Sequence, residues 1–306
     1  MTDYSTNPTA WFREVIVDKV TILDKTKGDY LAGMFMPGDR DGSSIKFPRS
    51  STGTVMYPLT GAIEPVVPSG IAIDVVTCQP EYFEAAAFVK RQDINKIGSS
   101  PALQQVLADD LQRSQRVKKD TIKLNALSNF AGIETIGTGG SILDILDISE
   151  ASDLILGVGE DEEIYCPIPF SWMTQLEMYK EFANSQWQGP TDLPLASRIG
   201  VRKRTWKGVN LFTVPDYMLE PFKPAEGELV TWAWSKSAMA AETPVDQQNV
   251  DISTRKDLQG NPEQFKTMVA GAAVGLNPKG VKKLRFKFAK RATRPVETVI
   301  TEAAGG

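Results

Sequence analysis

The clearest periodic pattern in the chain lies between residues 102 and 129. Apolar and small side chains recur there at steps of three and four residues, which is the spacing of one helix face. Ser99, Ser100 and Pro101 supply an N-cap and a proline at the first helical position, and Gly132 ends the pattern. The predicted helix is about 42 Å long at the usual rise per residue. Its predicted apolar stripe consists of Leu103, Val106, Leu107, Leu111, Ser114, Val117, Thr121, Leu124 and Ser128, and its polar face of Asp109, Gln112, Arg113, Arg116 and Lys119.

The sequence before this helix has the alternation that is typical of strands. Residues 15–23 alternate within an otherwise irregular stretch from 1 to 42, and we expect one strand there. Between 43 and 95, short alternating runs at 45–47, 54–57 and 71–77 are separated by prolines, which keep strands short or confine them to edges. The pattern predicts a long two-stranded arm. Such a hairpin is only marginally stable alone, so the arm implies a partner surface.

Helical and strand patterns alternate after the long helix. We expect a short helix at 149–156, a buried strand at 164–168 and a second helix from Pro169 to about 183. A hairpin is predicted at 201–205 and 209–214, around Trp206, Lys207 and Gly208. Further strands are predicted at 229–234, 250–253, 265–273 and 281–288. Strands at both ends around an α/β insert indicate the α+β fold class, with the outer segments forming one domain and the middle another.

Composition excludes several kinds of active site. The 306 residues include no histidine and only two cysteines, Cys78 and Cys166. Catalysis by Ser-His-Asp or Cys-His, zinc sites built on imidazole and four-cysteine zinc sites are therefore excluded. The chain has 34 Lys and Arg residues and 38 Asp and Glu residues, which gives a net charge of -4. This charge argues against a protein whose main task is to bind nucleic acid. We expect free thiols, a cytoplasm-like folding environment, no secretory signal and no membrane-spanning segment.

Three polar stretches have the residue types of a binding site. Residues 137–141 are glycine-rich but lack the Lys-Ser/Thr of a phosphate loop, so we predict a turn. Residues 160–163 are all acidic and could hold a hard cation, although a solvated loop is the favoured interpretation. Residues 38–42 contain Asp-x-Asp-Gly without the glutamate of an EF-hand, which favours a turn. With no acid–base pair identifiable, we predict no catalytic residue, no cofactor-binding residue and no metal site.

Two basic clusters occur in the second half of the chain. Alternation along residues 281–288 places Lys283, Arg285 and Lys287 on one strand face and apolar residues on the other. A solvated face or salt bridges between subunits account for these charges, and a surface that faces packaged nucleic acid is the sharper alternative. The clusters are Arg198, Arg202, Lys203, Arg204 and Lys207, then Lys282, Lys283, Arg285, Lys287, Lys290, Arg291 and Arg294.

The order of elements and several short motifs resemble a known family. The most specific motifs are Glu81-Tyr82-Phe83-Glu84, the run from Val89 to Lys96, Leu111-Gln112-Arg113, Asp120-Thr121-Ile122 and Asn125-Ala126-Leu127. Farther along, the matching segments are Pro169 to Leu176, Arg198-Ile199-Gly200, Trp206 to Val209 and Trp232 to Ala238. Together they resemble the major capsid proteins of tailed bacteriophages, whose shell fold is shared with encapsulins and herpesvirus capsid floors.

The resemblance implies a specific division of the chain. An N-terminal arm would occupy residues 1–42 and an extended β-hairpin loop residues 43–95. A peripheral domain would combine 96–139 with 241–306, with a long spine helix at about 101–129. An α/β axial domain would occupy 140–240.

The resemblance also implies assembly rather than catalysis. The chain would be a structural subunit, not an enzyme, that self-assembles into hexamers and pentamers of an icosahedral phage capsid enclosing double-stranded DNA. It would be assembled in the bacterial host cytoplasm and reside in the virion, without membrane contact. The implied partners are other copies of the chain, a separate scaffolding protein, a portal, decoration proteins and, by weak contact, DNA. Candidate DNA-facing residues are Arg113, Arg116, Lys118 and Lys119.

Two alternatives are compatible with the sequence. An encapsulin-type nanocompartment shell protein would share the fold but enclose an enzyme cargo. A soluble α/β enzyme with a carboxylate-based site would belong to another class, although the sequence nominates no carboxylate pair.

Overall fold

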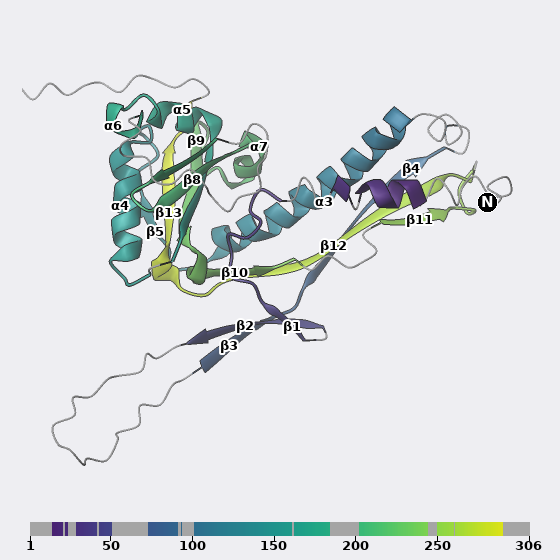
Figure 1. Cartoon of the computed structure of the whole chain (residues 1–306), viewed down its shortest axis with the longest axis horizontal. Helices are drawn as coiled ribbons and strands as arrows, with labels where there is room; N and C mark the ends of the chain where they lie inside the picture. Colours follow the sequence, from purple (N-terminus) through teal and green to yellow (C-terminus); the bar gives the residue numbers. More distant parts are fainter. Residues whose placement is uncertain are drawn as a thin grey trace, which may run out of the picture. The chain divides into compact units, whose positions relative to one another are not determined.

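The chain divides into two units, each assembled from two separate stretches. The computed structural model describes residues 14–20, 22–23, 29–41, 43–50, 73–90, 93, 101–160, 162–183, 202–243, 250–259 and 261–289. The first unit combines Met1–Asn129 with Met239–Leu276, and the second combines Phe130–Ala238 with Asn277–Gly306. Among the described residues, no helix is long and apolar enough to cross a membrane. Figure 1 shows the elements of both units.

The long strand β12 (Glu263–Gly275) organises the first unit. Its first part pairs antiparallel with β4 (Glu81–Val89) on one side and with β11 (Val250–Thr254) on the other. Its last part pairs with β10 (Met239–Glu242). The helix α3 (Pro101–Asn129) packs along β12. One strand therefore connects most of the elements of this unit.

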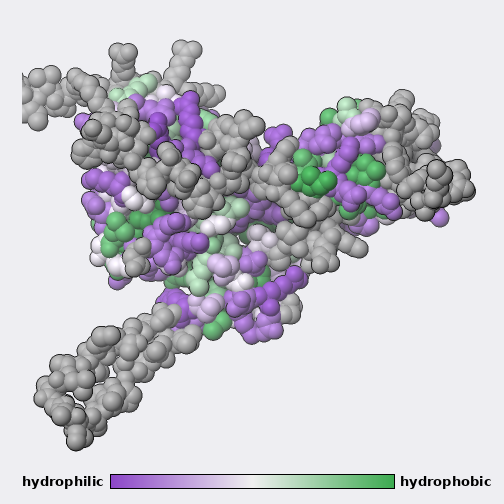
Figure 2. Space-filling model, in the orientation of Figure 1, coloured by the Kyte–Doolittle hydropathy of each residue, from purple (hydrophilic) through white to green (hydrophobic). Residues whose placement is uncertain are grey.

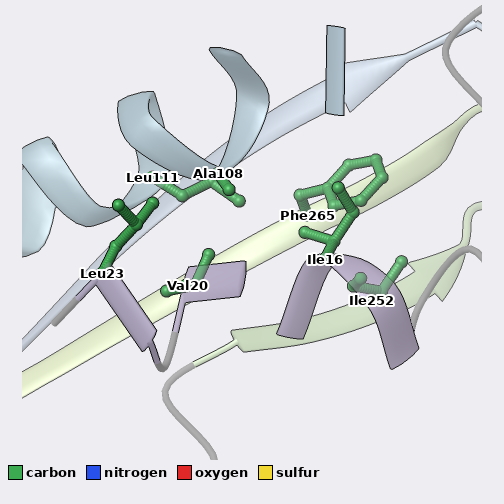
Figure 3. Packing of buried hydrophobic residues seen from close by; sticks show 7 residues of the cluster. All are labelled: Ile16, Val20, Leu23, Ala108, Leu111, Ile252 and Phe265. Atoms are coloured by element: carbon green, nitrogen blue, oxygen red, sulfur yellow. The ribbon is translucent and has the colours of Figure 1, made fainter. Parts of the chain in front are cut away.

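The N-terminal segment is helical where the sequence analysis expected a strand. Residues 14–20 form a helix, so the predicted strand at 15–23 is wrong. Ile16, Val20 and Leu23 are spaced by four and three residues, which places them on one helix face and outweighs the local alternation. They pack into a buried cluster with residues of α3, β11 and β12 (Figure 3), namely Ala108, Leu111, Ile252 and Phe265.

The base of the predicted arm is a hairpin. Strand β2 (Ser44–Ser50) pairs antiparallel with β3 (Ile73–Cys78), and the short β1 (Asp39–Asp41) pairs with β2. The predicted run at 54–57 lies outside the described residues. Strand β4 follows the hairpin and joins the sheet of β12 over its whole length. Nine backbone pairs with β12 hold it there, from Glu81–Gly271 to Val89–Glu263.

Helix α3 has the predicted bounds but not the predicted buried face. Leu103 and Val106, expected to be buried, are 47% and 65% exposed. Leu111 and Leu124 are buried as expected, but Asp120 and Lys123 are buried too, because they meet backbone and charged groups of residues 29–31. The buried residues of α3 are Gln104, Ala108, Leu111, Gln112, Gln115, Lys119, Asp120, Lys123, Leu124 and Leu127.

The second unit is built on a six-stranded mixed sheet in the order β5-β13-β9-β6-β8-β7. The predicted strands and the predicted hairpin with its turn at Lys207 and Gly208 are confirmed. Both turn residues have positive φ, 43° and 81°, as a tight two-residue hairpin turn requires. The strands are β5 (Glu134–Ile136), β6 (Ile164–Pro169), β7 (Lys203–Trp206), β8 (Val209–Val214), β9 (Glu228–Ser235) and β13 (Val281–Lys287).

Short helices connect and cover these strands. The N-terminus of α4 (Ile145–Leu156) has a capping box, in which Asp144 and Asp147 each accept a backbone N–H of the first turn. The predicted helix to residue 183 is divided into α5 (Phe170–Leu176) and α6 (Lys180–Ala183), with a turn between them. The remaining helices are α7 (Asp216–Leu219), η2 (Glu220–Phe222), η3 (Lys236–Ala238) and η4 (Pro278–Gly280).

Strand pairing joins two distant stretches of the chain in the sheet of the second unit. β13 pairs antiparallel with β9 and parallel with β5, so residues 277–289 and 130–139 belong with the second unit. The alternation predicted for β13 is confirmed at Leu284 and Phe286, which are buried, and at Lys287, which is exposed.

Candidate functional site

The glycine-rich stretch at 137–141 is a turn packed against β13. Gly137 and Gly139 have φ of 82° and 87°, and the backbone N–H of Gly139 donates to the carbonyl of Arg285 at 3.1 Å. A Cβ on Gly137 would lie 2.4 Å from the same carbonyl. The glycines are thus required by close packing, which agrees with the predicted turn rather than with a phosphate site.

The acidic stretch at 160–163 binds neighbouring protein groups. Glu160 accepts hydrogen bonds from Asn277 Nδ2 at 2.6 Å and from the Ser237 hydroxyl. Glu163 accepts from the Tyr165 hydroxyl, whose pKa is raised by burial and by that carboxylate. Within the described ranges, which omit Asp161, no three acidic or cysteine side chains converge as a metal site would require. Glu160 therefore fastens this loop to the rest of the second unit, and Glu163 binds the start of β6.

The described residues of the basic clusters include several with internal partners. Lys282 Nζ lies 2.6 Å from Glu134, and Arg285 Nε lies 2.7 Å from Glu228, whose carboxylate raises the pKa of the guanidinium. Arg198, Lys290, Arg291 and Arg294 lie outside the described residues. The salt bridges seen here are within one chain, so they do not require a second subunit.

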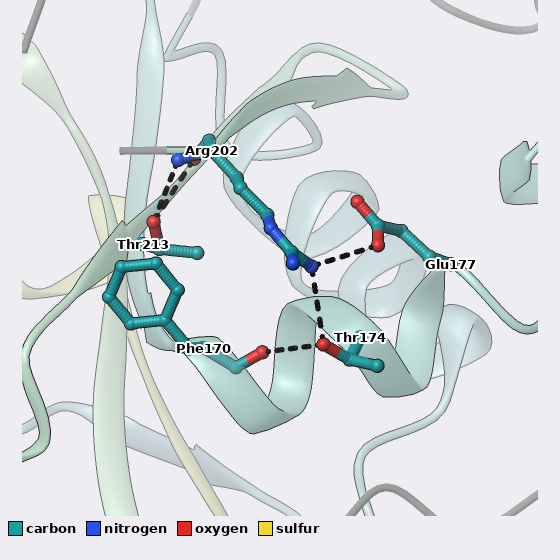
Figure 4. Close-up of polar contacts among 5 residues, drawn as sticks. All are labelled: Phe170, Thr174, Glu177, Arg202 and Thr213. Carbon is teal, nitrogen blue, oxygen red and sulfur yellow. Dashed lines mark hydrogen bonds and ion pairs between the residues drawn. The ribbon is translucent and has the colours of Figure 1, made fainter. Parts of the chain in front are cut away.

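Arg202 connects the start of β7 to α5 (Figure 4). Its guanidinium donates to Glu177 at 3.1 Å and to the Thr174 hydroxyl at 3.3 Å, and that hydroxyl donates to the Phe170 carbonyl. Its backbone N–H donates to Thr213 Oγ1 at 2.8 Å. Arg202 therefore holds the chain in place where it re-enters the sheet.

The hairpin arm is anchored by one apolar face. Ile45 and Phe47 are fully buried against Ala240, Ala272 and Leu276. The opposite face is open, and Val75 is 51% exposed there. The arm can therefore present its other face to a partner without losing its attachment.

The N-terminal segment is fastened to α3 by charge. Asp120 is buried and accepts the backbone N–H groups of Tyr30 at 3.2 Å and Leu31 at 3.1 Å. Burial, with a further contribution from the charge of Asp29, raises the pKa of Asp120 to about 6. Lys123 pairs with Asp29 at 3.3 Å. The sequence alone identified no pair of carboxylates. Asp29 and Asp120 form such a pair, and together they hold the N-terminal segment on α3.

The four candidate DNA-facing residues of α3 differ in their surroundings. Arg113 is exposed. Arg116 lies over the Tyr30 ring and Lys118 over the Phe83 ring, while Lys119 is 5% exposed. Three of the four are thus engaged within the subunit, and Arg113 retains the exposure that a contact with nucleic acid needs.

Large apolar side chains remain at the surface of several elements. On the sheet of the first unit these are Tyr82 (62% exposed), Phe88 (54%) and Met268 (49%). On the second unit, apolar atoms show at the surface over α4 (Figure 2), where Leu146 and Leu156 are exposed. The alternation along β4 places Tyr82 and Phe88 on one strand face, but it does not show that this face is the exposed one. Contiguous groups of such side chains mark surfaces that contact other proteins, whereas single ones are common on any protein surface.

Comparisons with solved structures show which proteins have a similar fold. The structure is similar to the head of Helicobacter pylori bacteriophage KHP40, at 7% identity and a TM-score of 0.57, over 85% of this chain and 91% of that one. It is similar to Gordonia phage Cozz at 11% identity and a TM-score of 0.55, over 85% and 87%. It also resembles an encapsulin complex from Synechococcus elongatus, at 12% identity and a TM-score of 0.54, over 90% and 93%.

At such low identities these likenesses establish the fold. No curated protein matches the sequence. The model of a family described as phage capsid protein matches residues 9–287, which is most of the chain. The chain therefore belongs to the phage capsid protein family, and it is a structural subunit of a capsid shell.

Proposed function

We propose that this subunit forms the hexamers and pentamers of an icosahedral shell that encloses double-stranded DNA. The family match over residues 9–287 is the observation that carries the proposal. Exposed apolar residues on β3, β4, β12, α3 and α4 support it, because a shell subunit needs several contact surfaces of this kind. Rings of heterologous contacts close when each subunit repeats the same rotation.

The two units have different tasks in this proposal. The first, with the spine helix α3 and the hairpin arm, is the peripheral part, and its arm extends over a neighbouring subunit. The second, with the six-stranded sheet, is the axial part, and it meets its counterparts at the centres of hexamers and pentamers. The arm's one-sided anchoring through Ile45 and Phe47 supports this assignment, since its opposite face stays available.

The proposed shell contains DNA without binding it tightly. A net charge of -4 limits non-specific attraction to phosphate, and Arg113 offers a local positive contact. The proposed partners are a separate scaffolding protein, a portal and decoration proteins, and the proposed place of assembly is the host cytoplasm. The subunit itself has a structural rather than an enzymatic task.

Electron microscopy of the purified protein tests the proposal. We expect closed particles or capsomer rings, formed by the chain alone or with its scaffolding protein. A protein that stays monomeric across a wide concentration range, with and without the scaffolding protein, would contradict it.

The encapsulin alternative shares the fold, as the likeness to the Synechococcus elongatus encapsulin illustrates. The two are separated by the contents of particles purified from the native source. Double-stranded DNA supports the phage capsid, whereas a co-purifying enzyme with no DNA supports a nanocompartment.

A further inference from the structure

The outer face of helix α4 is exposed although it carries apolar side chains. Leu146 is 71% exposed and Leu156 45%, and Val158, two residues beyond the helix, is 44% exposed. Glu150 and Asp153 are exposed between the two leucines. Residues 146, 150 and 153 are spaced by four and three, so they lie along one helix face, where Figure 2 shows apolar atoms at the surface. We call these five residues the acidic face.

The charge of the acidic face is not balanced within the described part of the second unit. Residues 144–156 include carboxylates at 144, 147, 150 and 153 and no lysine or arginine. The pKa of Asp147 is raised by burial and also by the charges of Asp144 and Glu150. Neither Glu150 nor Asp153 forms an ion pair with a residue that the structure describes. A cation from outside the unit is therefore the partner that this face lacks.

Helices α4 and α5 cover the same side of the six-stranded sheet. Helix α4 contacts β9 and β13, and its Ser149 hydroxyl accepts a hydrogen bond from the indole of Trp206 in β7 at 3.1 Å. The strand register places Trp206 on the same side as Phe286 of β13, which packs edge-on against Trp172 of α5. The even-numbered side chains of β13 therefore point toward the side of α4.

The other side of the same sheet is basic. Lys283, Arg285 and Lys287 have odd numbers in β13 and point away from α4, and we call them the basic face. Arg285 pairs with Glu228, but Lys283, which is half-buried, and Lys287, which is exposed, form no ion pair within the described ranges. Figure 1 shows α7 on this side of the sheet, opposite α4, and its Tyr217 is 39% exposed.

Opposite charges on opposite sides of one unit favour contact between unlike faces. Two acidic faces would repel each other, and so would two basic faces, whereas an acidic face attracts a basic face of another copy. A contact between unlike faces leaves one face of each kind free at the ends of every pair. Further copies can therefore add in the same way, and the series closes into a ring when the rotation between copies permits it.

We propose that the acidic face of α4 in one copy docks on the basic face of β13 in a second copy. The apolar ends of the acidic face would contact the surface around Tyr217, and Glu150 and Asp153 would pair with the two lysines. This inference rests on the proposed function, because a ring of identical subunits presents both faces at every contact. It names the two surfaces, and the order of their charges, by which neighbouring second units recognise each other.

Charge reversal on either face tests the contact. Glu150→Lys with Asp153→Lys, or Lys283→Glu with Lys287→Glu, places like charges against each other. Each double variant is expected to raise the protein concentration needed for particle formation at least about tenfold. The variant with all four substitutions restores opposite charges and should assemble within about threefold of the wild type. Urea unfolding of dissociated subunits verifies that each variant folds.

A second fourfold variant controls for net charge. It combines Glu150→Lys and Asp153→Lys with Arg113→Glu and Lys256→Glu, two exposed residues of the first unit. Its net charge equals that of the wild type, but its basic face is unchanged and still meets lysines. It should therefore assemble as poorly as the Glu150→Lys, Asp153→Lys double variant.

A mixture of the two double variants tests the head-to-tail arrangement. One variant has gained positive charge on the acidic face, and the other has gained negative charge on the basic face, so the two can alternate around a ring. Alternation closes in rings of six but not in rings of five. Electron microscopy of the mixture is expected to show hexameric rings without closed shells, whereas neither variant alone forms rings.

Three results would overturn this inference and leave the proposed function intact. They are double variants that assemble like the wild type, rescue by the control variant as complete as that by the charge swap, and a mixture that forms no rings. A wild-type chain that forms no particles would overturn the proposed function, and this inference with it.

Discussion

The ammonium group of Lys123 lies 3.3 Å from the carboxylate of Asp29, and the two side chains are only 6% and 10% exposed. One helical turn earlier, Asp120 accepts two backbone N–H groups of the segment that begins at Asp29. These three residues fasten the N-terminal segment to α3 by charge and hydrogen bonding.

Removal of the Lys123 charge is expected to destabilise the subunit strongly. Lys123→Met leaves Asp29 and Asp120 buried without their shared cation, and the free energy of unfolding should fall by about 3–5 kcal/mol. Lys223→Met, which breaks the more exposed pair with Glu220, is the control and should cost less than about 1 kcal/mol. Urea titration of dissociated subunits measures both, and equal losses would contradict a special role for the buried pair.

The buried carboxyl group of Asp120 predicts a particular dependence of stability on pH. The pKa of Asp120 is about 6 in the folded chain, against an ordinary value of 3.8. Between these values the folded chain binds more protons than the unfolded chain, so the free energy of unfolding falls as the pH rises through this range. This contribution amounts to at most about 3 kcal/mol.

Asp120→Asn tests this dependence. It removes one titrating group and also one acceptor, but the loss of the acceptor costs the same at every pH. The wild type should therefore lose stability relative to Asp120→Asn when the pH is raised from 4 to 7, as measured by urea unfolding at both values. A difference that stays constant, or that grows in the opposite direction, would show that the pKa of Asp120 is not raised.

Substitutions at two glycines with positive φ measure the cost of backbone strain separately from the cost of steric overlap. Gly137 has φ of 82° and no room for a Cβ, whereas Gly159 has φ of 89° and open space around it. Gly159→Ala should cost about 1 kcal/mol from the backbone conformation alone. Gly137→Ala should cost about 2 kcal/mol more, because β13 must move away from the new methyl group. Thermal unfolding of both variants measures the difference, and similar losses would contradict the steric argument.

Shortening the arm is expected to separate folding from assembly. Ser50 and Ile73 form the last described backbone pair of the hairpin, and residues 52–69 lie between them in the sequence. Replacing them with a short Gly-Ser turn should leave a folded subunit with normal urea unfolding but abolish stable shells in electron micrographs. Shells of normal stability would show that the arm is not an element between subunits.

Much of the architecture could be predicted because its signals are local. The bounds of α3 follow from Pro101 and from the helical period, and the β7–β8 hairpin follows from Lys207 and Gly208. The buried strand β6 follows from a short apolar run with a proline at its end. Each of these depends on residues that are close together in the sequence.

The predictions that differ from the structure concern features that depend on residues far apart in the sequence. The face of α3 that is buried depends on Asp29 and on the backbone of Tyr30, which the sequence of the helix does not reveal. Residues 14–20 are helical because their apolar face meets Phe265 and Ile252. The exposed side chain of Tyr82 lies in a motif that resembles the family, and Phe88 lies six residues farther along the same strand, but the exposure of both depends on the pairing of β4 with β12.

Only Gln79 and Pro80 separate the hairpin strand β3 from β4, and this short connection has a mechanical consequence. A force that pulls the hairpin along the axis of β4 loads the nine-residue ladder with β12 in shear. The hydrogen bonds of an antiparallel ladder run across the strands, so under shear they share the force and break together rather than one after another from an end. The ladder would therefore resist tension on an arm as one unit, because its hydrogen bonds must all break at the same time.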